Sequence, residues 1–401
     1  VKDIRSFAKY FCAMALGAEL DPELKLAFHD LRELKVDVVF PFLLELYDDF
    51  SRGILPHAEF LAAVRIVEAY VFRRAVCSIP TNSLNKTFAT FTKALKKDRY
   101  LESIKAHLLL MPSYRRFPTD EEFRRELQSR DLYSFPRRTY FLRMLENHGR
   151  KERVSVDEYT IEHILPQNEK LSLAWTTMLG PDWERVRQTW LHTLGNLTLT
   201  GYNSEYGDRP FLEKRDMPGG FKESPLRLNQ GLGQIDRWDE TAIRDRAAKL
   251  AAVAVEVWPI PVLSEATLAE YKPEPESPSY SIQDHPHLLS DKIRPLFDAF
   301  RREVLALDAC VTEEFLKKYV AYKAERNFVD IVPQAKRLRL TLNMTHADVI
   351  DPRGLCRNVA GRGHWGNGDV EVFLAGSDEL PYIMGLVRQS FEKQMGANGD
   401  S

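Results

Sequence analysis

Two short stretches of the chain carry residue types that could hydrolyse a phosphodiester. Glu162 and His163 stand side by side at the end of the apolar run 154–164, and Asn196 and Asn203 follow further along the chain. A neutral imidazole can take a proton from water near pH 7. A hard cation such as Mg²⁺ prefers carboxylate and amide oxygens. We therefore predict that His163 is a general base and that Glu162 and Asn203 bind Mg²⁺ or Mn²⁺.

These residues need a strand–strand–helix unit to bring them together. The β-branched and aromatic residues of 154–164 predict one strand, 196–200 predicts a second, and 204–215 predicts the helix that follows. Adjacent strand residues point to opposite faces, so Glu162 and His163 share one site only if the backbone bends. Further short helices are predicted at 173–179, 182–191 and 239–257.

The residues before this unit indicate a helical domain at 1–150. Apolar residues recur at three- and four-residue steps, which predicts helices over 39–47, 58–74 and 83–95. From residue 93 to residue 153 there are 16 Lys and Arg against 9 Asp and Glu. Basic pairs among aromatic residues favour contact with a phosphate backbone, and a solvated helix face is the alternative. The basic residues singled out are Arg115, Arg116, Arg137 and Arg138.

The sequence after residue 258 contains two further regions, a proline-rich segment and a second α+β region. Six prolines between 259 and 286 predict a semi-rigid linker. Residues 287–401 predict an α+β accessory domain with a small antiparallel sheet. Its expected elements are a helix at 288–307, strands at 328–332, 338–343 and 369–374, and a last helix at 379–393.

The composition sets limits on the class of protein. The net charge is −2 and no apolar run reaches the ~20 residues of a membrane span. Four cysteines contain no CxxC pair, which argues against a zinc ribbon and favours a reducing, cytoplasmic setting without membrane contact. The first residue is Val1, so we expect a piece of a longer protein.

The motifs also resemble a known family. The segments 162–167, 194–199 and 210–215, with Asn203, are similar to the HNH-type (His-Me finger) nuclease domain of GmrSD-type modification-dependent restriction endonucleases. The resemblance extends over roughly residues 1–258. Residues 287–401, with the glycine-rich stretch 361–368, resemble an uncharacterised domain appended to such proteins.

The resemblance implies a mostly helical α+β fold with a ββα-metal (HNH-like) core at 151–258. It implies a metal-dependent DNA endonuclease or nickase of bacterial anti-phage restriction, acting on DNA that includes modified phage DNA. An upstream nucleotide-hydrolysing sensor domain would be its partner. The resemblance gives Asn196 a role in fixing loop geometry, and Lys214 and Arg215 a role in binding phosphate.

Several alternatives stay open. His192 could support the site by reaching metal or phosphate, or pack against Trp190. The stretch 361–368 suits a phosphate-binding loop or a tight turn between strands. An inactive DNA-binding or assembly module and an RNase are alternatives to a DNA nuclease. The sequence leaves open an oligomer, the type of break and the DNA modification recognised.

Overall fold

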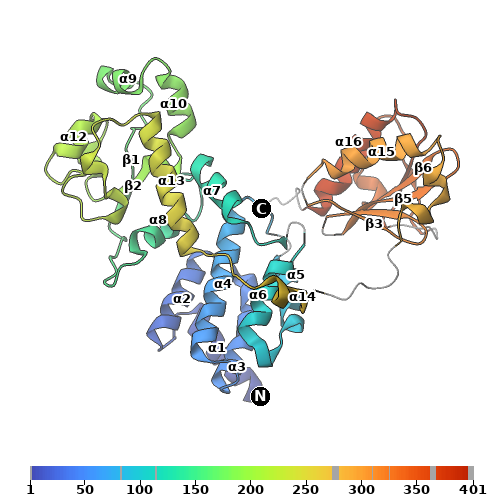
Figure 1. The fold of residues 1–401 in the computed structure, drawn as a ribbon, viewed down its shortest axis with the longest axis horizontal. Coiled ribbons are helices and arrows are strands. Elements are labelled where there is room, and N and C mark those ends of the chain that lie inside the picture. Colours follow the sequence, from blue (N-terminus) through green and yellow to red (C-terminus); the bar gives the residue numbers. More distant parts are fainter. Residues whose placement is uncertain are drawn as a thin grey trace. The chain divides into compact units, whose positions relative to one another are not determined.

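A computed structural model describes residues 2–81, 84–112, 115–272, 280–308, 310–324, 326–361 and 367–395. These residues form a mostly helical protein with a small antiparallel sheet, as the sequence predicted (Figure 1). The chain divides into two compact units. The first comprises Val1–Ile79, Phe88–Lys105 and Phe117–Leu263, and the second comprises Pro80–Thr87, Ala106–Arg116 and Ser264–Ser401. The finer division at residues 150 and 258 stays a prediction.

The first unit begins with amphipathic helices. Asp21 caps the start of α2 by accepting hydrogen bonds from Glu23 and Leu24, and Thr119 caps α7 in the same way. The expected helices at 39–47 and 58–74 are confirmed, and their periodic apolar residues are buried. The helix expected at 83–95 is shorter, since α5 ends at Phe91 and a 3₁₀ turn follows. The helices are α1 (Lys2–Ala15), α2 (Pro22–Glu33), α3 (Phe40–Ser51), α4 (His57–Val76), α5 (Leu84–Phe91), α6 (Tyr100–Leu110), α7 (Asp120–Ser129) and α8 (Arg138–Asn147).

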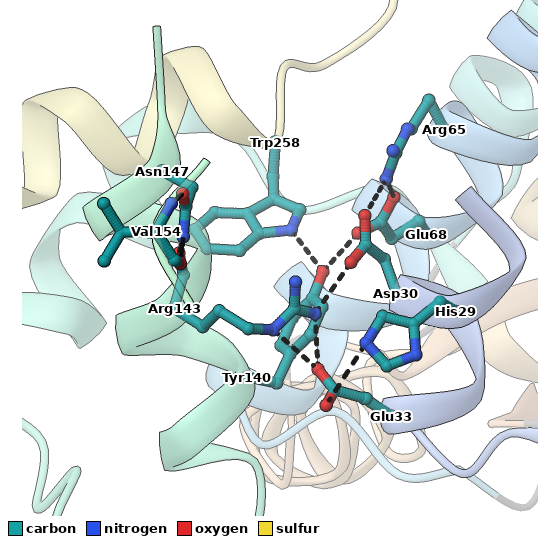
Figure 2. Close-up of polar contacts among 10 residues, drawn as sticks. All are labelled: His29, Asp30, Glu33, Arg65, Glu68, Tyr140, Arg143, Asn147, Val154 and Trp258. Carbon is teal, nitrogen blue, oxygen red and sulfur yellow. Dashed lines mark hydrogen bonds and ion pairs between the residues drawn. The ribbon is translucent and has the colours of Figure 1, made fainter. Parts of the chain in front are cut away.

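A buried ionic cluster joins α2, α4 and α8 to the residue that follows α13 (Figure 2). Arg65 donates to Asp30 at 2.7 Å and to Glu68 at 2.6 Å. Tyr140 donates to Glu68 and receives a bond of 2.8 Å from the indole of Trp258. Burial raises the pKa of Glu68, and the charge of Arg65 opposes that rise. Each charge in the cluster is compensated only while its partners stay in place.

A two-stranded antiparallel ribbon forms the centre of the remaining first unit. Strand β1 (Thr160–His163) pairs with β2 (Leu197–Thr200), so that His163 lies opposite Leu197. Trp175, Phe211 and Trp238 are fully buried in the core beside the ribbon. The surrounding elements are α9 (Leu173–Leu179), α10 (Trp183–Trp190), the 3₁₀ turn η5 (Leu194–Asn196), α11 (Asn203–Tyr206), α12 (Phe211–Asp216) and α13 (Glu240–Val257).

Two expectations for this region were wrong in extent. The strand expected over 154–164 is limited to Thr160–His163, because residues 154–159 form turns and irregular backbone. The single helix expected over 204–215 is two short helices, α11 and α12. Gly207 has φ 43° and ends α11, and Pro210 then starts α12 from an extended conformation. The helices expected at 173–179, 182–191 and 239–257 are confirmed.

The second unit contains a six-stranded antiparallel sheet in the order β3-β4-β5-β6-β8-β7. Helices α15 and α16 pack on one face of it (Figure 1), where Phe300 of α15 contacts Tyr322 of β4. The elements are β3 (Thr312–Phe315), β4 (Val320–Lys323), β5 (Asn327–Pro333), β6 (Leu338–Leu342), β7 (Arg357–Asn358), β8 (Val370–Leu374), α14 (Glu265–Ala269), α15 (Arg294–Leu305) and α16 (Leu380–Gln394).

Most expected elements of this unit are confirmed. The three expected strands are β5, β6 and β8, and the last helix is α16. The helix expected at 288–307 begins only at Arg294, after a 3₁₀ turn at Pro286–Leu289. Strands β3, β4 and β7 were not anticipated. Helix α14 lies inside the expected linker, whose central prolines at 273–278 lie outside the described residues, as do residues 362–366 of the glycine-rich stretch.

Candidate active site

His163 ends β1 and is held by a second histidine. Its side chain is nearly buried, and Nε2 lies 3.0 Å from Nδ1 of His192. The ring of Tyr133 meets His163 edge-on at 4.5 Å and stacks on His192 at 5.4 Å. Burial, with the nearby charges of His192 and Lys214, lowers the pKa of His163 to about 3. His163 is therefore neutral at physiological pH, which is the form that a general base requires.

The contact between the two imidazoles restricts which nitrogen of His163 carries its proton. A neutral imidazole has one N–H donor and one acceptor nitrogen. If His163 Nε2–H donates to His192 Nδ1, then Nδ1 of His163 keeps a free lone pair. If His192 Nδ1–H donates instead, Nδ1 of His163 is protonated. Only the first arrangement leaves His163 able to accept a proton from water.

Glu162 points to the other side of β1 and pairs with Lys214 of α12. Lys214 Nζ donates to Glu162 Oε1 at 2.6 Å and to the carbonyl oxygens of His163 and Ile164, both at 3.2 Å. Lys214 is fully buried, and these bonds use all three of its protons. Burial raises the pKa of Glu162 and lowers that of Lys214, while their mutual attraction opposes both shifts. In this arrangement Lys214 has no proton left for a phosphate.

Asn203 lies on the same side of β1 as Glu162. Its amide nitrogen donates to Thr160 Oγ1 at 3.1 Å and to the carbonyl oxygen of Ile161 at 3.2 Å. Among the described residues, no hydrogen bond engages Asn203 Oδ1 or Glu162 Oε2. Two oxygens of the kind that a hard divalent ion prefers thus have no hydrogen bond here, although Glu162 itself is buried beside Lys214. Asp208 also acts electrostatically on both Glu162 and Lys214.

Asn196 connects the end of β1 to the turn before β2. Its Oδ1 accepts from the backbone N–H of Leu165 at 2.7 Å and from the indole of Trp238 at 3.1 Å. Its Nδ2 donates to the carbonyl oxygens of Leu165 and Leu191 at 3.0 and 2.9 Å. Asn196 is fully buried. These four bonds fix the backbone on which both His163 and His192 stand.

The η5 turn is also held from behind by α13. Arg246 donates to the carbonyl oxygens of Leu194, Gly195 and Leu197 at 3.2, 2.7 and 2.8 Å. A Cβ at Gly195 would lie 2.1 Å from the carbonyl oxygen of Ile243, so only glycine allows this approach. Sequence reasoning missed Arg246 and Trp238. The stretch 239–257 also contains Arg244 and Lys249, so no local signal distinguished Arg246.

The expected phosphate-binding arginines are dispersed. Arg137 donates to the carbonyl oxygen of Leu34 at 2.8 Å. Arg215 pairs with Asp236 at 2.6 Å and donates to the carbonyl oxygen of Ile235. Arg138 lies 4.9 Å above the ring of Tyr133 and so adjoins the histidine pair. Arg115 and Arg116 belong to the second unit.

One further cluster has metal-ligand chemistry. In the described part of the chain, Asp21, Glu23 and His57 bring one ligand atom each within 4.8 Å of one another. Asp21 already caps α2, and His57 lies in the first turn of α4. The positive ends of two helix dipoles disfavour a cation there. This cluster includes none of the expected ligands.

A neutral histidine thus lies beside buried, oriented backbone, and two side-chain oxygens without a hydrogen bond among the described residues lie across the strand. Comparison with known proteins gives two family matches. Residues 117–253 match the model of the C-terminal domain of GmrSD restriction endonucleases. Residues 284–394 match a domain of unknown function, DUF5655. The resemblance to GmrSD-type restriction proteins is confirmed by these two matches, although residues before 117 are not covered by them.

The chain is also similar to a bacterial protein. An uncharacterized protein of Haemophilus influenzae (strain ATCC 51907 / DSM 11121 / KW20 / Rd) is 31% identical over 172 residues. The aligned part is 43% of this chain and 55% of the relative, so the chain spans about half the length of that protein. Within the described residues, no helix is both long and apolar enough to span a bilayer.

Proposed function

We propose that this chain is the effector part of a modification-dependent anti-phage restriction protein and hydrolyses DNA phosphodiesters in the cytoplasm. The observation that carries the proposal is the neutral, oriented His163 on a strand pair, within a segment that matches a restriction endonuclease domain. Strands β1 and β2 with the helices that follow are proposed to be a ββα-metal (HNH-like) core. An upstream nucleotide-hydrolysing domain is proposed to choose the DNA.

In this mechanism His163 is the general base. Its Nδ1 takes a proton from water as the water oxygen attacks phosphorus and the bond to the 3′ oxygen breaks. Its Nε2–H stays bonded to His192, so the imidazolium that forms keeps its orientation. Asn196 and Arg246 hold the backbone of the two histidines and thereby fix the direction of attack.

The residues present fit a hard divalent ion, Mg²⁺ or Mn²⁺. Glu162 Oε2 and Asn203 Oδ1 would hold it. Because Glu162 and His163 point to opposite sides of β1, the ion and the base can act on one phosphate only if the backbone bends between them. When bound, the ion would relieve negative charge on the phosphate and on the leaving oxygen. Lys214 already neutralises part of the charge of Glu162, so we expect weak binding with several retained waters.

Plasmid cleavage by His163→Ala tests the proposal. Loss of a general base should slow nicking by at least ~100-fold in Mg²⁺ or Mn²⁺. His148→Ala is a matched control, because His148 is half-exposed in the same unit and, among the described residues, its side chain has a polar contact only with Glu256. Equal rates for wild type and His163→Ala would contradict the proposal. Salt-dependent DNA binding without cleavage under any ion would favour the inactive binding module, and faster cleavage of matched RNA would favour an RNase.

His192 is proposed as a positioning residue that selects the tautomer of His163. In His192→Asn the amide oxygen can replace Nδ1 as the acceptor, whereas in His192→Gln it is displaced toward the position of Nε2. We therefore expect His192→Asn to retain more activity than His192→Gln. Nitrogen chemical shifts of His163 should show the Nε2–H form in wild type and His192→Asn. An unchanged tautomer in His192→Gln would contradict this role.

A further inference from the structure

Three arginines lie on the face of the second unit's sheet that α15 and α16 leave uncovered. They are Arg337, Arg339 and Arg357. In the antiparallel register Arg339 lies opposite Phe373, and Arg357 lies opposite Glu371. Directly opposed residues share a face. The alternate residues Leu338, Leu340, Val372 and Leu374 are fully buried on the helix side. The arginines therefore stand on the opposite face, over strands β6, β8 and β7.

Phe373 is the centre of this group. The guanidinium carbon of Arg337 lies 3.6 Å from the centroid of its ring, and that of Arg357 lies 5.1 Å from it. An arginine stacked on an aromatic ring keeps its N–H edges free for other partners. The Phe373 ring is half-buried, so the stacked cations remain at the surface.

The positive charge of this group is poorly compensated. Arg339 Nε is buried without a hydrogen bond, and its contact with Glu371 is 3.8 Å long. The guanidinium of Arg337 donates through Nε to Gln334 Oε1 at 2.9 Å, and it has no other hydrogen-bond partner in the described part of the chain. Among the described residues no hydrogen bond or ion pair engages the side chain of Arg357, which is exposed. Among the described residues, the three guanidinium groups therefore have one carboxylate nearby, that of Glu371. An anionic partner would supply the hydrogen-bond acceptors that they lack.

We propose that the face formed by Arg337, Arg339, Arg357 and Phe373 binds the phosphate backbone of DNA. The guanidinium fork matches phosphate oxygens bidentately, which an isolated ammonium does not. Stacking on Phe373 orders two of the arginines before binding and reduces the entropy cost of association. The second unit would then give the chain a contact with DNA that is separate from the site at His163.

The test uses the full chain carrying His163→Ala, so that DNA is not cut during the measurement. Binding of a 30-base-pair duplex is followed by fluorescence anisotropy between low and moderate salt. In Arg337→Gln/Arg357→Gln we expect weaker binding and a salt slope smaller by about 0.9 for each phosphate that the protein no longer neutralises. The matched control is Lys317→Gln/Lys318→Gln, which removes the same charge from the exposed turn between β3 and β4.

The outcomes of this test distinguish the proposed DNA-binding face from the proposed nuclease site at His163. A salt slope in the arginine double variant equal to that of the lysine control, with unchanged thermal midpoints, would overturn the DNA-binding face. Binding of the arginine face to anionic lipid vesicles but not to the duplex would overturn it as well. Arg337→Lys/Arg357→Lys keeps the charge but loses the bidentate guanidinium groups. An affinity between those of wild type and the double Gln variant therefore supports the DNA-binding face. None of these results depends on whether His163 cleaves.

Discussion

The ammonium of Lys214 and the carboxylate of Glu162 form a buried ion pair of 2.6 Å. The same ammonium also donates to the carbonyl oxygens of His163 and Ile164. A residue expected to bind phosphate thus supports the backbone of His163, the proposed general base. A carboxylate expected to bind an ion already has one cation beside it.

Removing one member of this pair should be costly. Lys214→Met leaves the Glu162 carboxylate buried without its partner, so we expect the free energy of unfolding to fall by about 3–5 kcal/mol in urea titrations. Glu162→Gln/Lys214→Met removes both charges and should recover a substantial part of that loss. Lys222→Met is the control, because Lys222 is an exposed lysine and its loss should stay within ~0.5 kcal/mol. Additive effects of the two single substitutions would argue against the pair.

The buried His163 should make stability depend on pH. Its folded pKa of about 3 is below the ordinary value of 6.5, so the unfolded chain binds a proton that the folded chain does not. This contribution is fully present above pH 6.5 and is lost as the pH falls from 6.5 toward 3. Urea titrations at several pH values should show a steeper decline in wild type than in His163→Gln. Identical declines in the two proteins would contradict the depressed pKa.

Asn196→Asp should weaken the connection between β1 and the η5 turn. The substitution keeps both accepted bonds but removes the donors to the carbonyl oxygens of Leu165 and Leu191. Each buried group left without a partner costs about 1–3 kcal/mol. Thermal unfolding should show the loss, and nicking should slow because the histidines lose their support. Asn358→Asp, at an exposed position of β7, should change neither measurement.

Gly195→Ala tests the contact between the η5 turn and α13. The added Cβ would lie 2.1 Å from the carbonyl oxygen of Ile243, so the turn or the helix must move. We expect a destabilisation of about 1–3 kcal/mol, as in other overpacked sites. Gly201→Ala is the matched control, since a Cβ there meets nothing within 4 Å. Equal unfolding midpoints in urea for the two variants would show that the turn is not closely packed.

Local patterns in the sequence were sufficient for most elements. The 3.6-residue period of 58–74 predicted α4, and the strand-like runs at 328–332, 338–343 and 369–374 predicted β5, β6 and β8. The predicted element boundaries were wrong where a single residue ends or starts a helix. Gly207 and Pro210 divide the helix expected at 204–215, and β7 is too short to show any period.

The contacts of the candidate site were less accessible from the sequence. Glu162 and Lys214 are distant in sequence, and nothing local indicates that they meet in the interior. Arg246 and Trp238 reach the η5 turn only because α13 folds back over it. Such contacts depend on tertiary packing, which residue types and spacing do not encode directly. The histidine pair required both the ribbon register and the position of Tyr133.

Helix α13 packs against both the strand ribbon and the amino-terminal helices. Near its start, Ile243 packs against the turn that carries Asn196, and after its end the ring of Trp258 contacts that of Phe72, with centroids 4.1 Å apart. Trp258 also bonds to Tyr140 within the ionic cluster. A truncation near residue 150 would cut through one shared interior. The amino-terminal helices and the strand ribbon should therefore melt in a single cooperative transition, and neither half should be recoverable as an independent folded fragment.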